Sequence, residues 1–156
     1  MDMTVYHGTD LMFSEFRFDV AAPPNGASNG YLGVWLSKTP RLAERFGQYC
    51  LTVSAHVGRT YSMPLTELVR LHDEVQSRVR QRSADADLAV IERDFYASVH
   101  IKLLGGGFDF IDIVEDSGRV HMCVGLVTAN LTILSRTSDH VADPTRSVRS
   151  LTAFNI

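Results

Sequence analysis

The chain has 156 residues, of which 45% are hydrophobic and 21% charged, and its formal net charge is -3. These values are typical of one globular domain with a core of its own, and they exclude collagen-like, coiled-coil and intrinsically disordered chains. The net negative charge also argues against nucleic acid or an anionic membrane surface as the partner.

The two cysteines, Cys50 and Cys123, lie in apolar stretches (QYCLTV and HMCVGL) and are too few for a disulfide framework. They are predicted to be small buried side chains. No apolar run reaches the roughly 18 residues of a membrane-spanning helix. The first residues, MDMTVYHGTD, lack the pattern of a signal peptide. We therefore expect a single cytoplasmic domain over residues 1–156, with 135–156 as a polar C-terminal extension.

The first third of the chain predicts short strands. Residues 3–7 and 50–57 alternate apolar and polar side chains, as strands with one buried face do, and 34–37 (VWLS) is a shorter strand. Thr39 and Pro40 suit the start of a helix, so the segment RLAERF is predicted to be a short helix.

Two irregular segments separate these elements. Phe13, Phe16 and Phe18 lie in the first, which we expect to pack back on the core. The second, residues 20–33 (VAAPPNGASNGYLG), contains prolines and glycines that exclude a helix, and it is predicted to be a mobile loop.

Apolar residues at helical spacing predict two amphipathic helices, at 65–82 and 86–104, and the glycines at 105–107 end the second one. The strands predicted after them are 108–114, 119–127 and 131–134. The first two are joined by a turn at 115–118 and so form a hairpin. Strands, then two helices, then strands indicate an α+β fold.

Several familiar signatures of chemistry are absent. The six histidines form no HxxxH or HxC pair, so no metal site is expected. The glycine triplet follows a helix and precedes a strand, the reverse of the order that cradles a phosphate. There is no GxSxG nucleophile elbow.

Two linked blocks in the first half carry the functional signal. The first is VYHGT, with His7-Gly8-Thr9 at the end of a strand, and the second is GYLGVWLSKTPRLAERFG. In this order they resemble the ADP-ribosyltransferase superfamily of the histidine–tyrosine–glutamate type, which includes diphtheria toxin, the poly(ADP-ribose) polymerases and short phage and bacterial transferases. The resemblance covers residues 5–57 well and 108–134 more loosely.

The resemblance implies two packed, mostly antiparallel sheets with flanking helices and an NAD cleft between them. On the family pattern, His7 would hold a ribose hydroxyl of the adenosine half of NAD. The Gly8 backbone would bind the nicotinamide carboxamide, which requires a residue without a Cβ. Thr9 and Ser37 would add hydroxyl contacts.

The family's nicotinamide-stacking residues fall on Trp35, which replaces a tyrosine, and on Phe46, eleven residues later. Each ring would contribute offset stacking of about 0.5–1.5 kcal/mol. Ordinary burial remains an alternative for both, because a strand–helix unit buries aromatic residues in any case. In the same way, His7 alone is compatible with a packed strand histidine.

The third family motif is missing. The position of the family glutamate falls on Met122, next to His121. The carboxylates nearby are Asp112 within the preceding strand and Glu115 or Asp116 at the hairpin turn. Three alternatives stay open. The enzyme relies on the acid of its substrate, or Asp112 or Glu115 replaces the glutamate, or the site binds NAD or nothing and the protein works by contact.

The resemblance therefore implies an NAD-dependent mono-ADP-ribosyltransferase that modifies a protein, with the loop 20–32 as a lid over the dinucleotide. A role as a phage or bacterial effector that disables a host or defence protein is implied by the resemblance alone. The alternatives are a catalytically silent transferase fold that acts as a binding or inhibitor module, NAD hydrolysis, and phosphate removal from RNA ends. The enzymatic prediction requires that His7 and Trp35 converge on one dinucleotide.

Overall fold

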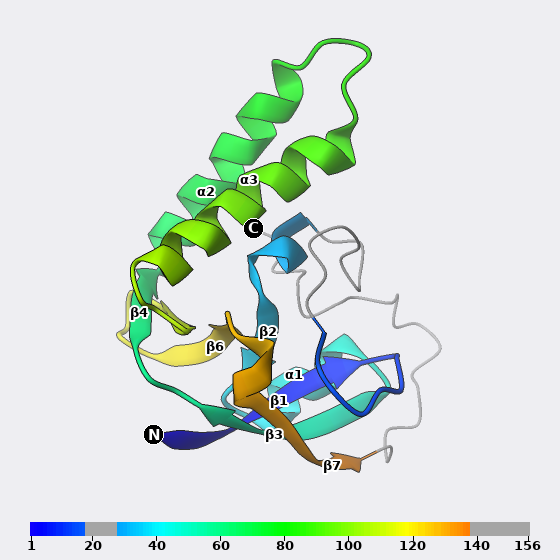
Figure 1. Cartoon of the computed structure of the whole chain (residues 1–156), viewed down its shortest axis with the longest axis vertical. Coiled ribbons are helices and arrows are strands. Elements are labelled where there is room, and N and C mark those ends of the chain that lie inside the picture. The colour runs from blue at the N-terminus through cyan, green and yellow to red at the C-terminus, as the bar shows by residue number, and fades with distance from the viewer. Residues whose placement is uncertain (18–27, 138–156) are drawn as a thin grey trace.

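The computed structural model describes residues 1–17 and 28–137, which form an α+β fold around one seven-stranded sheet (Figure 1). The strands are β1 (Asp2–Thr9), β2 (Val34–Ser37), β3 (Tyr49–His56), β4 (Thr60–Pro64), β5 (Phe110–Val114), β6 (Val120–Gly125) and β7 (Leu131–Thr137). The helices are α1 (Pro40–Ala43), α2 (Leu65–Arg80) and α3 (Leu88–Gly105), with the short 3-10 helices η1 (Ser28–Leu32), η2 (Glu44–Phe46) and η3 (Thr128–Asn130).

The strand order in the sheet is β4-β5-β6-β2-β1-β3-β7. All neighbouring pairs are antiparallel except β4 and β5, which are parallel and are connected through α2 and α3. A parallel pair needs such a long crossover, because the chain must return to the end of the sheet at which it started. The predicted α+β class and mostly antiparallel pairing are confirmed.

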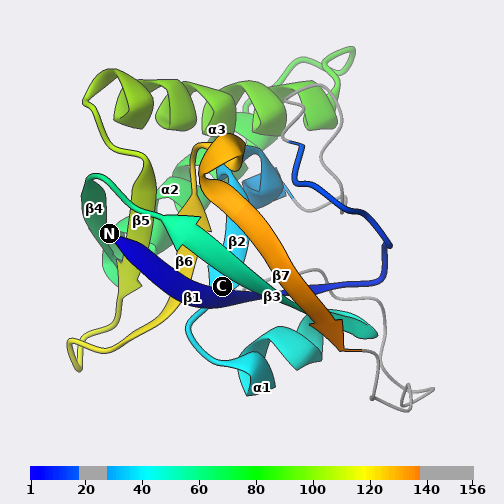
Figure 2. The same ribbon diagram turned by 60° about the horizontal axis from the view of Figure 1, so that its bottom comes forward.

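The prediction of two separate sheets is wrong for the described residues, because their strands form one continuous sheet that curls. Figure 2 shows β1, β3 and β7 crossing in front of β2 and β6. The curl brings Leu131 of β7 against Gly125 of β6, where a Cβ would lie 3.0 Å from a Leu131 methyl group. Strand twist accumulates over many strands, so a long sheet folds toward itself.

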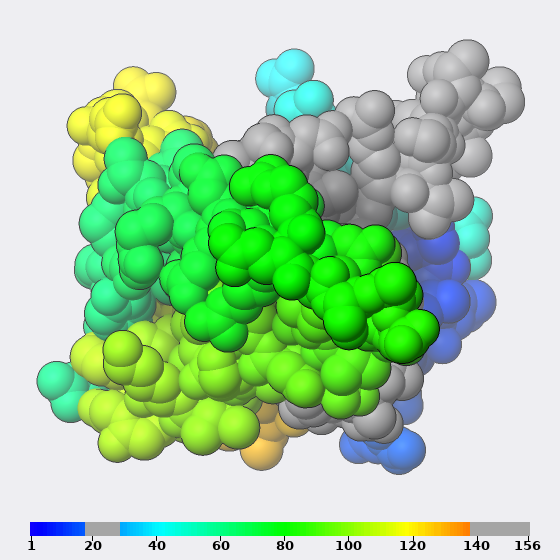
Figure 3. Space-filling model, turned by 90° about the horizontal axis from the view of Figure 1, so that it is seen from above, coloured from blue at the N-terminus to red at the C-terminus, as the bar shows by residue number. Residues whose placement is uncertain are grey.

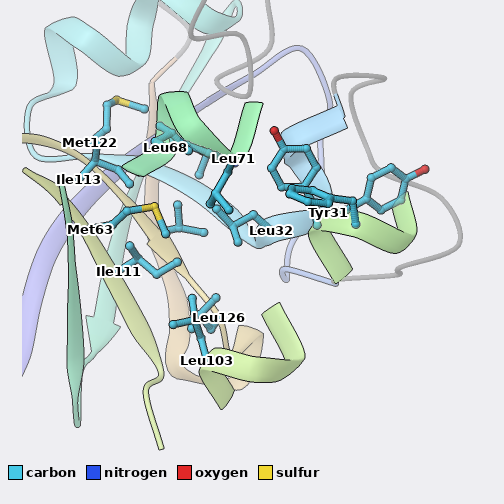
Figure 4. Close-up of a cluster of buried hydrophobic side chains, with 14 of the residues drawn as sticks. Tyr31, Leu32, Met63, Leu68, Leu71, Leu103, Ile111, Ile113, Met122 and Leu126 are labelled. Atoms are coloured by element: carbon cyan, nitrogen blue, oxygen red, sulfur yellow. The ribbon is translucent and has the colours of Figure 1, made fainter. Parts of the chain in front are cut away.

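Two hydrophobic cores follow from this shape. The helix-side core lies between the sheet and the hairpin of α2 and α3, which dominates the view in Figure 3. In Figure 4, Met63 and Ile111 from the sheet lie close to Leu68 and Leu71 from α2. The inner core lies within the curl, on the opposite face of the sheet, and its buried side chains include Val5, Leu36, Leu51, Val53, Phe110 and Cys123. Each fully buried aliphatic side chain stabilises the fold by about 1.5–3 kcal/mol.

The observed helices α2 and α3 and the hairpin of β5 and β6 confirm the predictions made from the sequence. Asp87 caps α3 by accepting a hydrogen bond from the backbone N–H of Ala89 (2.9 Å). The hairpin turn closes with Gly118 at a φ of 78°, a conformation that glycine adopts without strain. Both cysteines are buried and free. None of the helices within residues 1–17 and 28–137 has the length and apolar character needed to cross a bilayer.

Two local predictions need correction. Residues 28–32 are not loop but the helix η1, in which Tyr31 is 7% and Leu32 0% exposed, because these apolar side chains anchor it in the helix-side core. This part of the expected lid is therefore packed inside the fold. Residues 20–27 lie outside the described residues, as do Phe18 and 138–156. Strand β4 was not predicted, since it is a short edge strand with one partner, β5.

Candidate functional site

His7, at the end of β1, is the most strongly perturbed of the predicted site residues. Its side chain is buried, and its Nδ1 lies 2.8 Å from the carbonyl oxygen of Trp35. Burial lowers the pKa of His7 to about 4, against the smaller opposing effect of that hydrogen bond. The ring is therefore neutral at pH 7.

The tautomer of His7 follows from its partner. A carbonyl oxygen only accepts, so Nδ1 must carry the proton and donate it to Trp35. In a neutral imidazole the other nitrogen, Nε2, then carries a lone pair and no proton. Within the described part of the chain, Nε2 makes no hydrogen bond. His7 thus presents one free acceptor on a ring of fixed orientation.

An aromatic cover lies over this ring. We define the cover as residues 10–17; its Phe16 and Phe13 rings approach the imidazole edge-on, with centroid distances of 5.2 and 6.0 Å. The Asp10 carboxylate accepts a hydrogen bond from the backbone of Gln48 (2.9 Å) and fixes the start of the cover. The expectation that Phe13 and Phe16 pack back on the core is confirmed, since both join the inner core.

Thr9 contributes to the start of the cover, through its hydroxyl. That oxygen accepts a hydrogen bond from the backbone N–H of Leu11 (3.0 Å), and Thr9 is 4% exposed. Such a local bond is a turn-forming contact, so the Thr9 hydroxyl is engaged in shaping the chain after β1.

Gly8 is explained by close packing. A Cβ at Gly8 would overlap the carbonyl oxygen of Ala43 and come within 3.2 Å of the Phe46 Cβ. The absence of a side chain at Gly8 therefore lets α1 and η2 dock against β1. The structure does bring Gly8 and Phe46 together, and Phe46 packs against the helix-side core.

The rings of His7 and Trp35 lie on opposite faces of the sheet, which corrects the expected convergence. Tyr6 pairs with Ser37 between antiparallel β1 and β2, so His7 stands opposite Leu36 and Gly8 opposite Trp35. Opposite residues share a face and successive residues alternate. The Trp35 ring is accordingly 1% exposed in the helix-side core and donates to the carbonyl of Asn29 (2.9 Å), while His7 faces the curl.

Ser37 has a local structural role. Its hydroxyl donates to the carbonyl oxygen of Thr39 (2.7 Å) and accepts from the backbone N–H of the same residue (3.0 Å). The side chain is completely buried at the turn from β2 into α1. Both hydrogen-bonding capacities are used within the chain, so the Ser37 hydroxyl is not poised for a ligand.

Asp112 shares a face with His7 but lies far from it. Asp112 pairs with Cys123, and Cys123 with Leu36, so three strand spacings, about 14 Å, separate Asp112 from His7. Leu36 and Cys123 between them are fully buried. The Asp112 Oδ1 lies 3.0 Å from the Lys38 Nζ, an ion pair without a well-directed hydrogen bond. The structure therefore does not bring Asp112 to His7.

Glu115 and Met122 also lie outside the His7 site. Glu115, at the hairpin turn, has a half-exposed side chain 3.9 Å from the Nε2 of His121. Met122, the position of the family glutamate, is 1% exposed in the helix-side core. Neither predicted replacement carboxylate joins His7. Within residues 1–17 and 28–137, no three His, Cys, Asp or Glu side chains gather as metal ligands.

Sequence reasoning missed two charged partners that the register reveals. Lys38 pairs with Asp112, and Arg136 donates to the carbonyl oxygen of Phe13 (2.7 Å) across 123 positions of sequence. The signal available for the cover was the pair of phenylalanines, Phe13 and Phe16, shortly after the HGT motif. No local sequence pattern indicates that Arg136 is the cation that contacts this segment.

Comparisons with known proteins add one distant neighbour. No family model matches the chain, and no curated protein matches it significantly. A crystal structure of an anti-CRISPR protein is similar over 86% of this chain and 96% of that chain, with a TM-score of 0.43 and 13% sequence identity. A similarity at this level carries no conclusion about the chain.

Proposed function

We propose that the chain is an NAD-dependent mono-ADP-ribosyltransferase in which His7 binds a ribose hydroxyl of NAD. The observation that carries the proposal is the neutral imidazole whose Nδ1 is committed to the Trp35 carbonyl and whose Nε2 keeps a free lone pair. A ribose hydroxyl is a donor that such an acceptor binds in one orientation. The low pKa keeps His7 an acceptor throughout the neutral range.

The reaction needs little from the protein beyond positioning. The bond between the nicotinamide nitrogen and the ribose C1′ breaks, its electron pair neutralises the pyridinium, and an oxocarbenium-like sugar develops. A nucleophile on the target then bonds to C1′ and loses its proton. Nicotinamide leaves without needing protonation, so orientation of the ribose is the main contribution of the enzyme.

The position of the carboxylates supports one of the three alternatives left open by the sequence. Asp112 is held in an ion pair with Lys38, and Glu115 lies at the hairpin turn. We therefore assign the acceptor's proton to a base on the target, as in family members with an apolar residue at the glutamate position. The convergence of His7 and Trp35 on one dinucleotide, which the enzymatic prediction required, is absent, because the Trp35 ring lies in the helix-side core. The proposal therefore rests on His7 alone, and Trp35 has no stacking role in it.

A second candidate, a catalytically silent binding module, is favoured by a specific observation. Met122 stands in place of the family glutamate and is buried with Trp35 among apolar side chains. If the protein acts by contact alone, His7 is a packing residue under the aromatic cover.

Incubation with NAD labelled in the adenylate, in a cell lysate and alone, separates the candidates. Label on a discrete lysate protein supports transfer. Nicotinamide release without any lysate indicates hydrolysis instead, and no release together with no shift of the melting temperature by NAD supports the silent module.

Variants connect the activity to His7. His7→Gln should abolish labelling, because a flexible amide that donates to the Trp35 carbonyl no longer holds an acceptor at the fixed position of Nε2. The matched control, His56→Gln, changes an exposed histidine on β3 and should label as the wild type does. Labelling by a folded His7→Gln variant would overturn the assignment, and loss of labelling in a folded Asp112→Asn variant would contradict the separation of Asp112 from the site.

A further inference from the structure

Arg136, near the end of edge strand β7, lies in the same cross-strand row as His7. His7 pairs with Leu51 of β3, and Leu51 pairs with Arg136 of β7, so all three residues share the inner face of the sheet. Two strand spacings, about 10 Å, separate the backbone of His7 from that of Arg136. A long arginine side chain spans much of that distance.

The guanidinium of Arg136 holds the cover in place. Its Nη2 donates to the carbonyl oxygen of Phe13 (2.7 Å), and the Phe13 ring lies against His7. Arg136 itself is exposed, so the bond is accessible to solvent and to competing anions. Of the contacts made by the cover, this one joins it to the far edge strand of the sheet.

A carbonyl oxygen is a weaker partner for a guanidinium than a phosphate oxygen is. Arginine presents a planar fork of donors that matches phosphate, and charge-assisted bonds are roughly twice as strong as bonds between neutral groups. An anion that reaches Arg136 therefore competes with the Phe13 carbonyl for the Nη2 donor. Loss of that bond loosens the middle of the cover, which is then held by the aromatic contacts of Phe13 and Phe16 with His7 and by their packing on the inner core.

We propose that Arg136 is a latch that exchanges the Phe13 carbonyl for the pyrophosphate of the dinucleotide, and that this exchange opens the cover over His7. The inference rests on the proposed function, because it takes NAD as the ligand. NAD carries its pyrophosphate between two riboses, so one ligand bonds Arg136 through the pyrophosphate and Nε2 of His7 through a ribose hydroxyl. Arg136 is thus both an anion-binding residue and a positioning residue for the His7 site.

The test measures how fast diethylpyrocarbonate acylates His7 in the full chain, followed by mass spectrometry at neutral pH. The lone pair of a neutral imidazole nitrogen attacks a carbonyl carbon of the reagent and displaces ethyl carbonate, so His7 should react slowly only because the cover shields it. The exposed His56 is the internal reference in the same molecule. Arg136→Gln removes the latch, and Arg70→Gln is the matched control, because Arg70 is exposed on α2, outside the cover, and pairs with Glu74.

We expect Arg136→Gln to raise the rate of acylation of His7 about fivefold, which corresponds to the loss of one exposed hydrogen bond. The rate of acylation of His56 should not change. Arg70→Gln should react at His7 as the wild type does. Inorganic pyrophosphate should accelerate acylation of His7 in the wild type and leave the Arg136→Gln variant unaffected. An unchanged rate in Arg136→Gln would overturn the latch, and acceleration by pyrophosphate that persists in that variant would overturn anion binding at Arg136.

NAD separates this inference from the proposed function. NAD should protect His7 in the wild type, because the ribose hydroxyl then occupies Nε2. If pyrophosphate accelerates acylation through Arg136 but NAD does not protect His7, the latch stands and the proposed function fails.

Discussion

The buried histidine makes the stability of the fold depend on pH in a defined window. In the unfolded chain His7 takes up a proton near its ordinary pKa of 6.5, whereas in the folded chain burial lowers its pKa to about 4. Between these values the unfolded state binds more protons, so the free energy of unfolding rises with pH there. Stability is therefore lost as the pH falls from about 6.5 to about 4, and His7 adds no further loss below that.

The size of the effect follows from the displacement of the pKa. Each pKa unit corresponds to about 1.4 kcal/mol, so His7 contributes a loss of about 3 kcal/mol across the window. His7 is 7% exposed, so solvent screening reduces this value little. A loss of this size is a large fraction of the stability of an ordinary domain.

The assay is urea unfolding at a series of pH values from 7 to 4, for the wild type and for His7→Gln. Carboxylates titrate in both proteins, so the difference between the two curves isolates His7. We expect the wild type to lose about 3 kcal/mol more than His7→Gln over the window. The control His56→Gln should stay within about 1 kcal/mol of the wild type, because an exposed ion pair contributes little. Parallel curves for the wild type and His7→Gln would refute the buried, neutral imidazole.

Three further predictions concern packing and charge. Gly8→Ala should lower the free energy of unfolding by about 3 kcal/mol in a urea titration, since its Cβ would overlap the Ala43 carbonyl. The control Gly105→Ala has open space around its Cβ and should be neutral or slightly stabilising. Lys38→Met should destabilise the fold by about 2 kcal/mol, because it leaves Asp112 without its cation. Adding Asp112→Asn should restore about half of the lost stability. A double variant no more stable than Lys38→Met would refute the pairing. Cys123 is fully buried, and burial raises its pKa to about 12. It should therefore not react with Ellman's reagent at pH 8 until the protein unfolds. Rapid reaction of the folded protein would contradict the place of Cys123 in the inner core.

The sequence predicted the elements whose signals are local. The strand at 34–37 matches β2 residue for residue, and α2 and α3 follow their apolar spacing closely. Strand β4 was missed because it is short and polar. Two helices also separate it in the sequence from its partner, β5. Helix η1 was missed because Tyr31 and Leu32 are fixed by packing against the core, which overrides the glycine-rich composition around them.

The site was harder to predict because its geometry depends on register. Alternation tells which residues of one strand share a face, but not which face of the neighbouring strand they join. Pairing of Tyr6 with Ser37 sends His7 and Trp35 to opposite faces, and a shift of one residue would have placed them together. The same argument applies to Asp112, whose distance from His7 is set by the number of strands between them, and to Arg136, which pairing with Leu51 brings into the His7 row.

Nitrogen NMR of the protein labelled with ¹⁵N-histidine and titrated with NAD near pH 7 tests whether Nε2 of His7 accepts a hydrogen bond from the dinucleotide. A lone pair at Nε2 gives that nitrogen the resonance of an unprotonated imidazole nitrogen, distinct from the protonated Nδ1. The account predicts that the Nε2 resonance of His7 moves on addition of NAD and reaches a plateau, as the ribose hydroxyl donates to it. A His7 Nε2 resonance that carries a proton, or one that stays in place at every NAD concentration, would contradict it.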